Sequence, residues 1–82
     1  MENFTITKKF GNEENWFYIE FISAGAEYYY FCDIEWDKIK VSICEDRGLD
    51  NNPQLAWGIY DKPENLENFM LEQIDTFCVW DI

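Results

Sequence analysis

The side chains that most often do chemistry in proteins are scarce in this sequence of 82 residues. Histidine, the commonest general base and metal ligand, is absent. Cys32, Cys44 and Cys78 are widely spaced and form no CxxC pair, which argues against a zinc site or a disulfide framework. We expect these cysteines to be reduced thiols of the core, and we expect neither a cofactor nor a metal.

Other arrangements that support catalysis or metal binding are weak here. The segment from Glu45 to Asn52 is rich in side-chain oxygens, but it lacks the alternating ligands and the twelfth-position glutamate of an EF-hand. Carboxylate pairs for glycoside hydrolysis can be drawn in many ways, yet nothing marks a substrate cleft. Phosphate loops, nucleophile elbows and Cys–His pairs are absent. The sequence therefore favours a protein that is not an enzyme and acts by binding.

The net charge of the chain limits the classes of molecule that it is expected to bind. Seventeen acidic residues face six basic ones, which gives a net charge of -11. Such a field repels nucleic acids and anionic membranes and attracts basic proteins. The segment Met1-Glu2-Asn3-Phe4 lacks the features of a secretion signal, and no apolar run approaches the roughly 18 residues that span a bilayer. We expect a cytoplasmic protein that binds neither nucleic acid directly nor a membrane.

The elements that must position any binding residues follow from hydrophobic periodicity. Residues 1–82 contain no repeat or linker and are predicted to form a single domain, with a core made dense by aromatic side chains. Apolar residues alternate with a period of two in several segments. The predicted strands are Phe4–Phe10, Trp16–Ser23, Glu27–Glu35, Ile39–Glu45 and, weakened by Gly58, Leu55–Tyr60.

One helix is predicted at the C-terminal end. Asp61 and Glu64 have the spacing of a capping box, and Pro63 suits a first turn, so the helix is expected to start at Asp61. Its apolar stripe consists of Leu66, Phe69, Met70, Ile74, Phe77 and Cys78. The predicted fold is α+β: an antiparallel meander of four or five strands with one C-terminal helix packed on one face. Which face it covers stays open.

Two acidic groups stand out on this framework. Glu64, Glu72 and Asp75 line the helix face opposite the apolar stripe, and no basic residue occurs between positions 63 and 82. Asp33, Glu35 and their neighbours interleave with aromatic residues along the third strand. Since both faces of the second and third strands carry rings, some rings must be exposed. The plain alternatives are a solvated helix face and cross-strand ring pairs that only shield the sheet.

The main functional hypothesis is an acidic protein inhibitor that binds the basic, nucleic-acid-binding face of an enzyme. Its carboxylates would replace phosphates, and its rings would anchor the contact. The candidate partner-binding residues are Glu64, Glu72, Asp75, Asp33, Glu35, Asp37, Trp16, Tyr18, Tyr28, Tyr30 and Trp36. The expected partner is a basic protein such as a nuclease or another nucleic-acid-binding effector, and the free chain is expected to be a monomer or weak homodimer.

Two settings suit this hypothesis equally: an immunity protein against a nuclease toxin, and a phage-encoded anti-CRISPR or anti-restriction DNA mimic. The chain is similar to both groups in size and composition, but no stretch matches a family motif. The alternative function is a non-catalytic adaptor or self-associating module that uses an exposed aromatic sheet face. In that case the negative charge would serve only solubility.

Overall fold

The computed structural model of the protein describes residues 4–12, 14–48 and 50–80, which form five strands and one helix. The strands are β1 (Thr5–Asn12), β2 (Trp16–Ser23), β3 (Ala26–Glu35), β4 (Lys38–Glu45) and β5 (Gln54–Asp61), and the helix is α1 (Leu66–Trp80). Each strand pairs antiparallel with the next, in the order β1-β2-β3-β4-β5. The predicted α+β meander with a C-terminal helix is confirmed, and the fifth strand forms in spite of Gly58.

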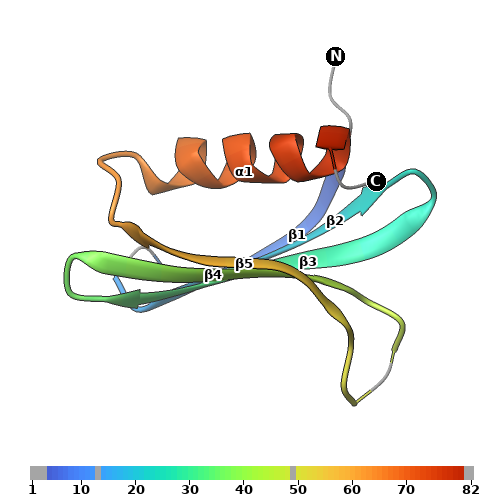
Figure 1. Ribbon diagram of the computed structural model, residues 1–82, viewed down its shortest axis with the longest axis horizontal. Coiled ribbons are helices and arrows are strands. Elements are labelled where there is room, and N and C mark those ends of the chain that lie inside the picture. The colour runs from blue at the N-terminus through green and yellow to red at the C-terminus, as the bar shows by residue number, and fades with distance from the viewer. Residues whose placement is uncertain (1–3, 13, 49, 81–82) are drawn as a thin grey trace.

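The molecule has two layers, because α1 lies across one face of the sheet and no described element lies on the other (Figure 1). The core fills the space between the layers. From the helix it takes Leu66, Met70, Ile74, Phe77 and Cys78, all predicted for the apolar stripe. From the sheet it takes Ile19, Phe21, Tyr28, Tyr30, Cys32, Ile34, Ile39, Val41 and Ile43, and Phe4, directly before β1, joins them. The period of two therefore sorts each central strand into a buried and an uncovered side.

Strand β1 departs from the predicted alternation. The pattern had placed Ile6, Lys8 and Phe10 on one side, but the pairing with β2 shifts between Ile6 and Lys8. Thr7 is the extra residue of this β-bulge, and its hydroxyl donates to the backbone oxygen of Glu20 at 3.2 Å. A bulge reverses the side to which the following residues point. As a result Ile6 packs against the core while Lys8 and Phe10 lie on the uncovered side.

The predicted start of the helix at Asp61 is wrong. Asp61 is the last residue of β5, opposite Lys38, and the Lys62 amide still donates to the Asp37 oxygen at 2.7 Å. Pro63 favours an extended conformation in the residue before it, so the chain stays in the sheet beyond Asp61. The cap is instead Asn65, whose side-chain oxygen accepts from the Asn68 amide at 3.0 Å.

The three cysteines are free and buried, as expected for core thiols. Burial raises the pKa of Cys32 to about 11, which keeps that thiol protonated at neutral pH. Residues 1–3, on which the secretion-signal prediction depends, lie outside the described residues, as does Asp81 of the acidic C-terminal segment. Among the described residues, no helix combines the length and apolarity that crossing a bilayer requires.

Candidate functional site

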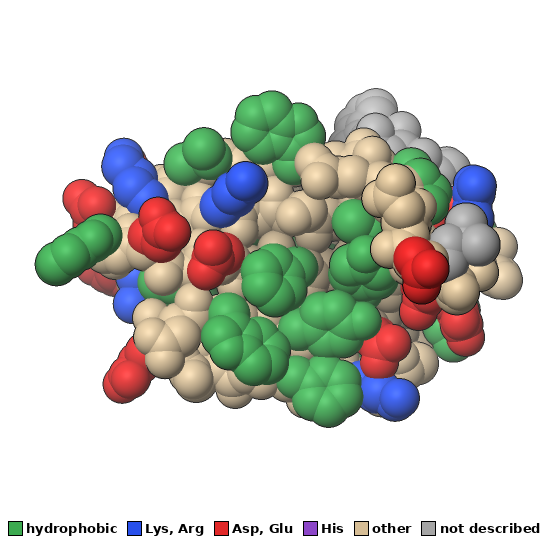
Figure 2. Space-filling model, turned by 90° about the horizontal axis from the view of Figure 1, so that it is seen from below, with side chains coloured by type: hydrophobic (Ala, Val, Ile, Leu, Met, Phe, Trp, Pro, Cys, Tyr) green, Lys and Arg blue, Asp and Glu red, His purple; other side chains and the backbone are tan. Residues whose placement is uncertain are grey.

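The uncovered side of the sheet, here called the open face, carries large apolar side chains from four strands. Figure 2 shows this side, with hydrophobic groups gathered near its middle and charged groups toward its ends. Its large apolar side chains are Phe10, Trp16, Tyr18, Ile22, Tyr29, Phe31, Trp57 and Ile59. Trp57 and Ile59 are 64% and 62% exposed. Apolar residues this exposed and this close together are typical of a surface that contacts another macromolecule.

The strand register aligns part of this set in a row across the whole sheet. Phe10 lies opposite Tyr18, and Tyr18 lies opposite Phe31. Ser42 and then Trp57 continue the row on β4 and β5. The rings contact one another: the centroids of Phe10 and Tyr18 are 5.7 Å apart, and Trp16 stacks on Phe31 at 6.3 Å with 14° between planes. Such contacts stiffen the rings, so little conformational entropy is lost when a partner covers them.

Tyr18, in this row, and Tyr29, beside the row on β3, supply hydrogen-bonding groups on the open face. Their rings are 5.5 Å apart. Burial, with a smaller effect of the Glu20 charge, raises the pKa of Tyr18 to about 12. A hydrogen bond with Cys44 and burial raise the pKa of Tyr29. Both phenols therefore stay neutral and keep their protons at physiological pH.

Most basic side chains near the open face already form ion pairs. Lys8 faces Glu20 at 3.8 Å. Lys38 forms an ion pair with Asp61, and this contact raises the pKa of Lys38 and lowers that of Asp61. These exposed pairs contribute little to stability. Their main effect is to cancel charge along the two outer strands.

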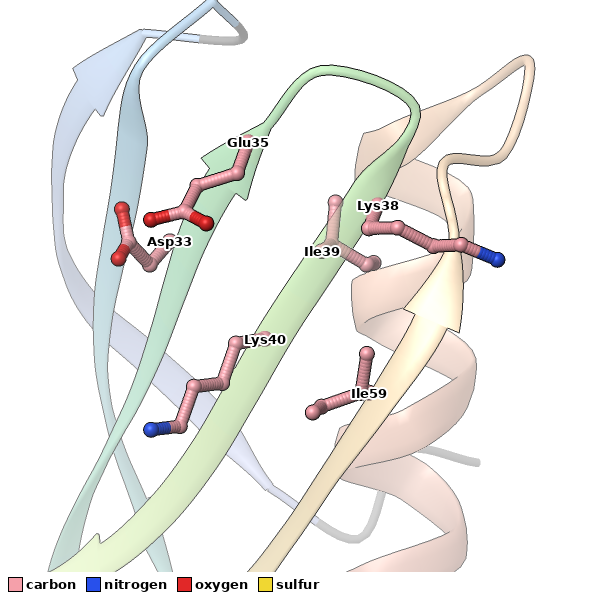
Figure 3. A pocket seen from close by; sticks show the side chains of 6 residues that line it. All are labelled: Asp33, Glu35, Lys38, Ile39, Lys40 and Ile59. Atoms are coloured by element: carbon pink, nitrogen blue, oxygen red, sulfur yellow. The ribbon is translucent and has the colours of Figure 1, made fainter.

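Asp33 and Glu35 differ from those acids, because neither takes part in the ion pairs found among the described residues. Both project from the same side of β3, and Figure 3 shows the Lys38 ammonium directed away from them toward β5. With Lys38, Ile39, Lys40 and Ile59 they line a partly open hollow of about 270 Å³. Lys40 lies directly opposite Asp33 across the strands but forms none of the ion pairs found among the described residues. The two carboxylates are therefore placed to meet a basic side chain of a partner.

Trp36 lies at the tip of the turn between β3 and β4, directly after Glu35. Its side chain is 96% exposed, and its backbone has a φ of 59°. A bulky residue in this left-handed region is a conformational outlier, and such outliers cluster at functional sites. We call the surface around this turn the hairpin surface. It consists of Trp36, Asp37, Glu35, Asp33 and Trp16. Asp33 connects the turn to Trp16, its direct neighbour across the strands.

The predicted candidate residues divide between two sides of the molecule. Trp16, Tyr18, Asp33 and Glu35 belong to the open face, and Trp36 and Asp37 extend it at the turn. Glu64, Glu72 and Asp75 are exposed beside or along α1, on the other side of the sheet. The two acidic groups therefore cannot belong to one flat contact surface. The acids of the helix and the acids of β3 are two separate features.

Tyr28 and Tyr30 are wrongly predicted as partner-binding residues. They point toward α1 and are buried, with Tyr30 0% exposed. The Tyr30 hydroxyl donates a hydrogen bond to the side-chain oxygen of Gln73, and Tyr28 packs edge-on against Phe77. The alternation that puts Asp33 and Glu35 in solvent requires this outcome, because residues an odd number of positions apart lie on opposite faces.

Sequence reasoning missed Phe10, Tyr29, Phe31, Trp57 and Ile59 as parts of the candidate surface. A signal for two of them was available, since Tyr29 and Phe31 share the odd-numbered phase of Asp33 and Glu35 on β3. Phe10 was obscured by the bulge at Thr7. Trp57 and Ile59 were obscured because the fifth strand was only a weak prediction.

The oxygen-rich loop between β4 and β5 uses its side chains internally. The Asn52 side-chain oxygen accepts from the Arg47 amide at 3.0 Å, and Asp46 accepts from the Gly48 amide at 3.0 Å. These contacts stabilise the turn. Among the described residues, no group of three Cys, Asp or Glu side chains is placed to hold a metal ion.

Comparisons with protein-family models, curated proteins and solved structures gave no match. Functional inference therefore depends on the surfaces of this chain alone.

Proposed function

We propose that this chain is a non-catalytic, acidic protein-binding domain that inhibits a nucleic-acid-binding enzyme by docking on its basic face. The observation that carries the proposal is the hairpin surface, where carboxylates without ion-pair partners lie beside exposed tryptophans. The occupant would be a cluster of Arg and Lys that otherwise contacts phosphates. A nuclease toxin and a restriction or CRISPR nuclease are both partners of this kind.

Carboxylates and rings play different parts in such a contact. Asp33 and Glu35 project from a paired central strand, so their spacing is held by the sheet. A rigid pair of carboxylates suits the bidentate geometry of arginine. Trp36 and Trp16 supply apolar area that can be desolvated at the contact, which is where interface binding energy concentrates.

Charge placement favours the hairpin surface over the rest of the molecule. On the helix side, Glu64, Glu72 and Asp75 are acidic, but the large exposed ring of the sheet on that side, Tyr60, already packs edge-on against Phe69 of α1. Toward β1 the rings lie beside the paired Lys8 and Glu20. Around the turn from β3 to β4, acids that form no ion pair among the described residues lie beside the exposed Trp36 and Trp16. The whole-molecule charge of -11 would still accelerate the approach of any basic protein.

A matched pair of charge reversals tests the location of the contact. The variants Asp33→Lys with Glu35→Lys, and Glu72→Lys with Asp75→Lys, each reverse two charges and change the net charge from -11 to -7. Both lose the same amount of long-range attraction. Only the first changes the hairpin surface, so it should weaken binding at least about tenfold more than the second. Trp36→Ala, which keeps all charges, should weaken binding mainly through faster dissociation.

The measurement begins with affinity capture from a host lysate at low and high salt, with mass spectrometric identification. Support requires a basic nucleic-acid-binding protein that the wild type captures and inhibits in a stoichiometric complex. Equal weakening by the two double variants would move the contact away from the hairpin surface. An association rate indifferent to salt would contradict charge steering.

A second candidate function is an adaptor that docks through the open face with no need for charge. The exposure of Trp57 and Ile59, which lie away from the tip, favours it. Tyr30 cannot take part in such a contact, because it is buried. This function predicts capture that survives high salt and is lost on Trp57→Lys but not on the reversal of Asp33 and Glu35.

A further inference from the structure

The outer edge of β5 is the least protected part of the sheet. Edge strands usually carry lysines, prolines or bulges that block pairing with another chain. From Gln54 to Tyr60 this strand contains no charged residue and no proline. Its bulge, at Leu55, leaves residues 56–61 in regular register with β4. In Figure 1 β5 lies at the front of the sheet, and no described element covers its outer edge.

The backbone groups along this edge alternate in direction. The amide of Lys62 donates to Asp37, toward the β4 side. Successive residues of a strand direct their N–H and C=O groups to opposite sides. Tyr60 and Gly58 therefore bond toward β4, whereas Trp57, Ile59 and Asp61 present their N–H and C=O groups outward. These are the groups that a further strand would use.

We propose that β5 pairs antiparallel with β5 of a second copy of this chain, giving a two-fold symmetric dimer with one continuous ten-stranded sheet. A register centred on Gly58 satisfies the outward backbone groups. It places Trp57 opposite Ile59 of the second copy, and by symmetry Ile59 opposite its Trp57. Aromatic and β-branched residues form favourable cross-strand pairs. The two open faces then lie on the same side and form one surface.

Charge does not prevent a second copy from pairing with this edge, although each chain is strongly negative. The repelling groups lie away from the edge, and Asp61 is the only charged residue of β5. In the proposed register each Asp61 lies opposite Leu55 of the other copy, six residues from the other Asp61. At about 3.4 Å per residue the two carboxylates are roughly 20 Å apart. That is more than two Debye lengths at physiological ionic strength, and Lys38 also neutralises each one.

Two measurements on the purified full chain test the dimer, and neither needs the partner of the proposed function. Sedimentation velocity should show a shift from monomer to dimer as concentration rises. Amide exchange followed by NMR should slow at Trp57, Ile59 and Asp61 with increasing concentration. The Gly58 and Tyr60 amides, already bonded toward β4, should not respond.

Matched variants separate edge pairing from stacking of two open faces. Ile59→Lys places a charge on β5, and Trp16→Lys places the same charge on the open face of an inner strand. Edge pairing predicts that Ile59→Lys raises the dimer dissociation constant at least about tenfold and that Trp16→Lys leaves it within about twofold. Circular dichroism confirms that each variant is folded. A chain that stays monomeric, or a dimer weakened by Trp16→Lys without protection of the three outward amides, overturns the proposal.

Discussion

The two edge strands of the sheet, β1 and β5, are built in opposite ways. β1 has a bulge at Thr7 and consecutive lysines, of which Lys8 pairs with Glu20 and Lys9 with Glu67. β5 has no lysine, its bulge at Leu55 lies near its start, and it exposes Trp57 and Ile59. Bulges and lysines prevent a strand from accepting another chain. The contrast teaches that a high net charge does not by itself protect every edge of a sheet, because protection depends on where the charged residues lie.

The charged residues are also distributed unevenly between β1 and β5. Only six residues of the chain are basic, and two of them, Lys8 and Lys9, lie on β1. Asp33 and Glu35, which form no ion pair among the described residues, lie on the central strand β3, between a protected edge and an unprotected one. The two proposed contacts therefore differ in character: the one at the hairpin surface is charged, and the one along β5 is uncharged.

The largest expected effect comes from adding one methyl group to each edge strand. In β1, Gly11 has a φ of 98°, and a Cβ there would lie 2.3 Å from the backbone oxygen of Trp16. We expect Gly11→Ala to cost about 3 kcal/mol, because a strained backbone and a clash with main chain add together. In β5, a Cβ at Gly58 meets only the ring end of Tyr60, at 2.6 Å. Chemical denaturation should show a loss for Gly58→Ala below about 1.5 kcal/mol, and equal losses would contradict the contrast.

Removing the lysines of β1 should convert a protected edge into an unprotected one. With Lys8→Thr and Lys9→Thr both edges become available, and a chain with two such edges can assemble beyond a dimer. Light scattering should show concentration-dependent species larger than dimers for this variant and none for the wild type. Adding Ile59→Lys to the same variant should return the mass to that of a dimer. Assembly that persists unchanged would show that the β5 edge plays no part.

A smaller effect is expected from truncating one exposed ring on each edge strand. Phe10 on β1 contacts Tyr18, so Phe10→Ala should cost about 1 kcal/mol of unfolding free energy. Trp57 is more exposed, and Trp57→Ala should change stability by about 0.5 kcal/mol or less. Denaturation is measured at a concentration low enough for the monomer. A larger loss at Trp57 would mean that this residue supports the fold of the single chain.

The smallest effect at ordinary pH is expected from the ionisation of Tyr18, which lies beside β1. Burial raises its pKa from 10.0 to about 12, with Glu20 contributing. The pKa of Tyr18 is higher in the folded state than in the unfolded state. Its contribution to the free energy of unfolding is therefore fully present below pH 10 and is lost as the pH rises toward 12. Tyrosinate absorbance should show late ionisation, and Phe10→Ala should bring the Tyr18 pKa back toward 10.0. A Tyr18 that titrates normally in the wild type would contradict its shielding.

Much of this architecture is determined by the sequence by itself. The alternation of apolar residues predicts the strands, the short turns between them predict a meander, and steps of three and four residues predict the buried stripe of α1 from Leu66 to Cys78. These features depend on near neighbours, and local periodicity encodes them. The acidity and the lack of histidine are likewise visible before folding.

Only the tertiary structure decided where the binding surfaces lie. Alternation divides β3 into Tyr28 with Tyr30 and Tyr29 with Phe31, but the packing of α1 determines which pair is buried. The bulge at Thr7 arises from the pairing of β1 with β2, and the later start of α1 arises from the pairing of β5 with β4. The periodicity of the sequence does not encode such pairing. The edge at β5 exists only because the strand order leaves it last. Burial and pairing between distant segments are long-range properties, and these properties separate the hairpin surface from the acids of the helix.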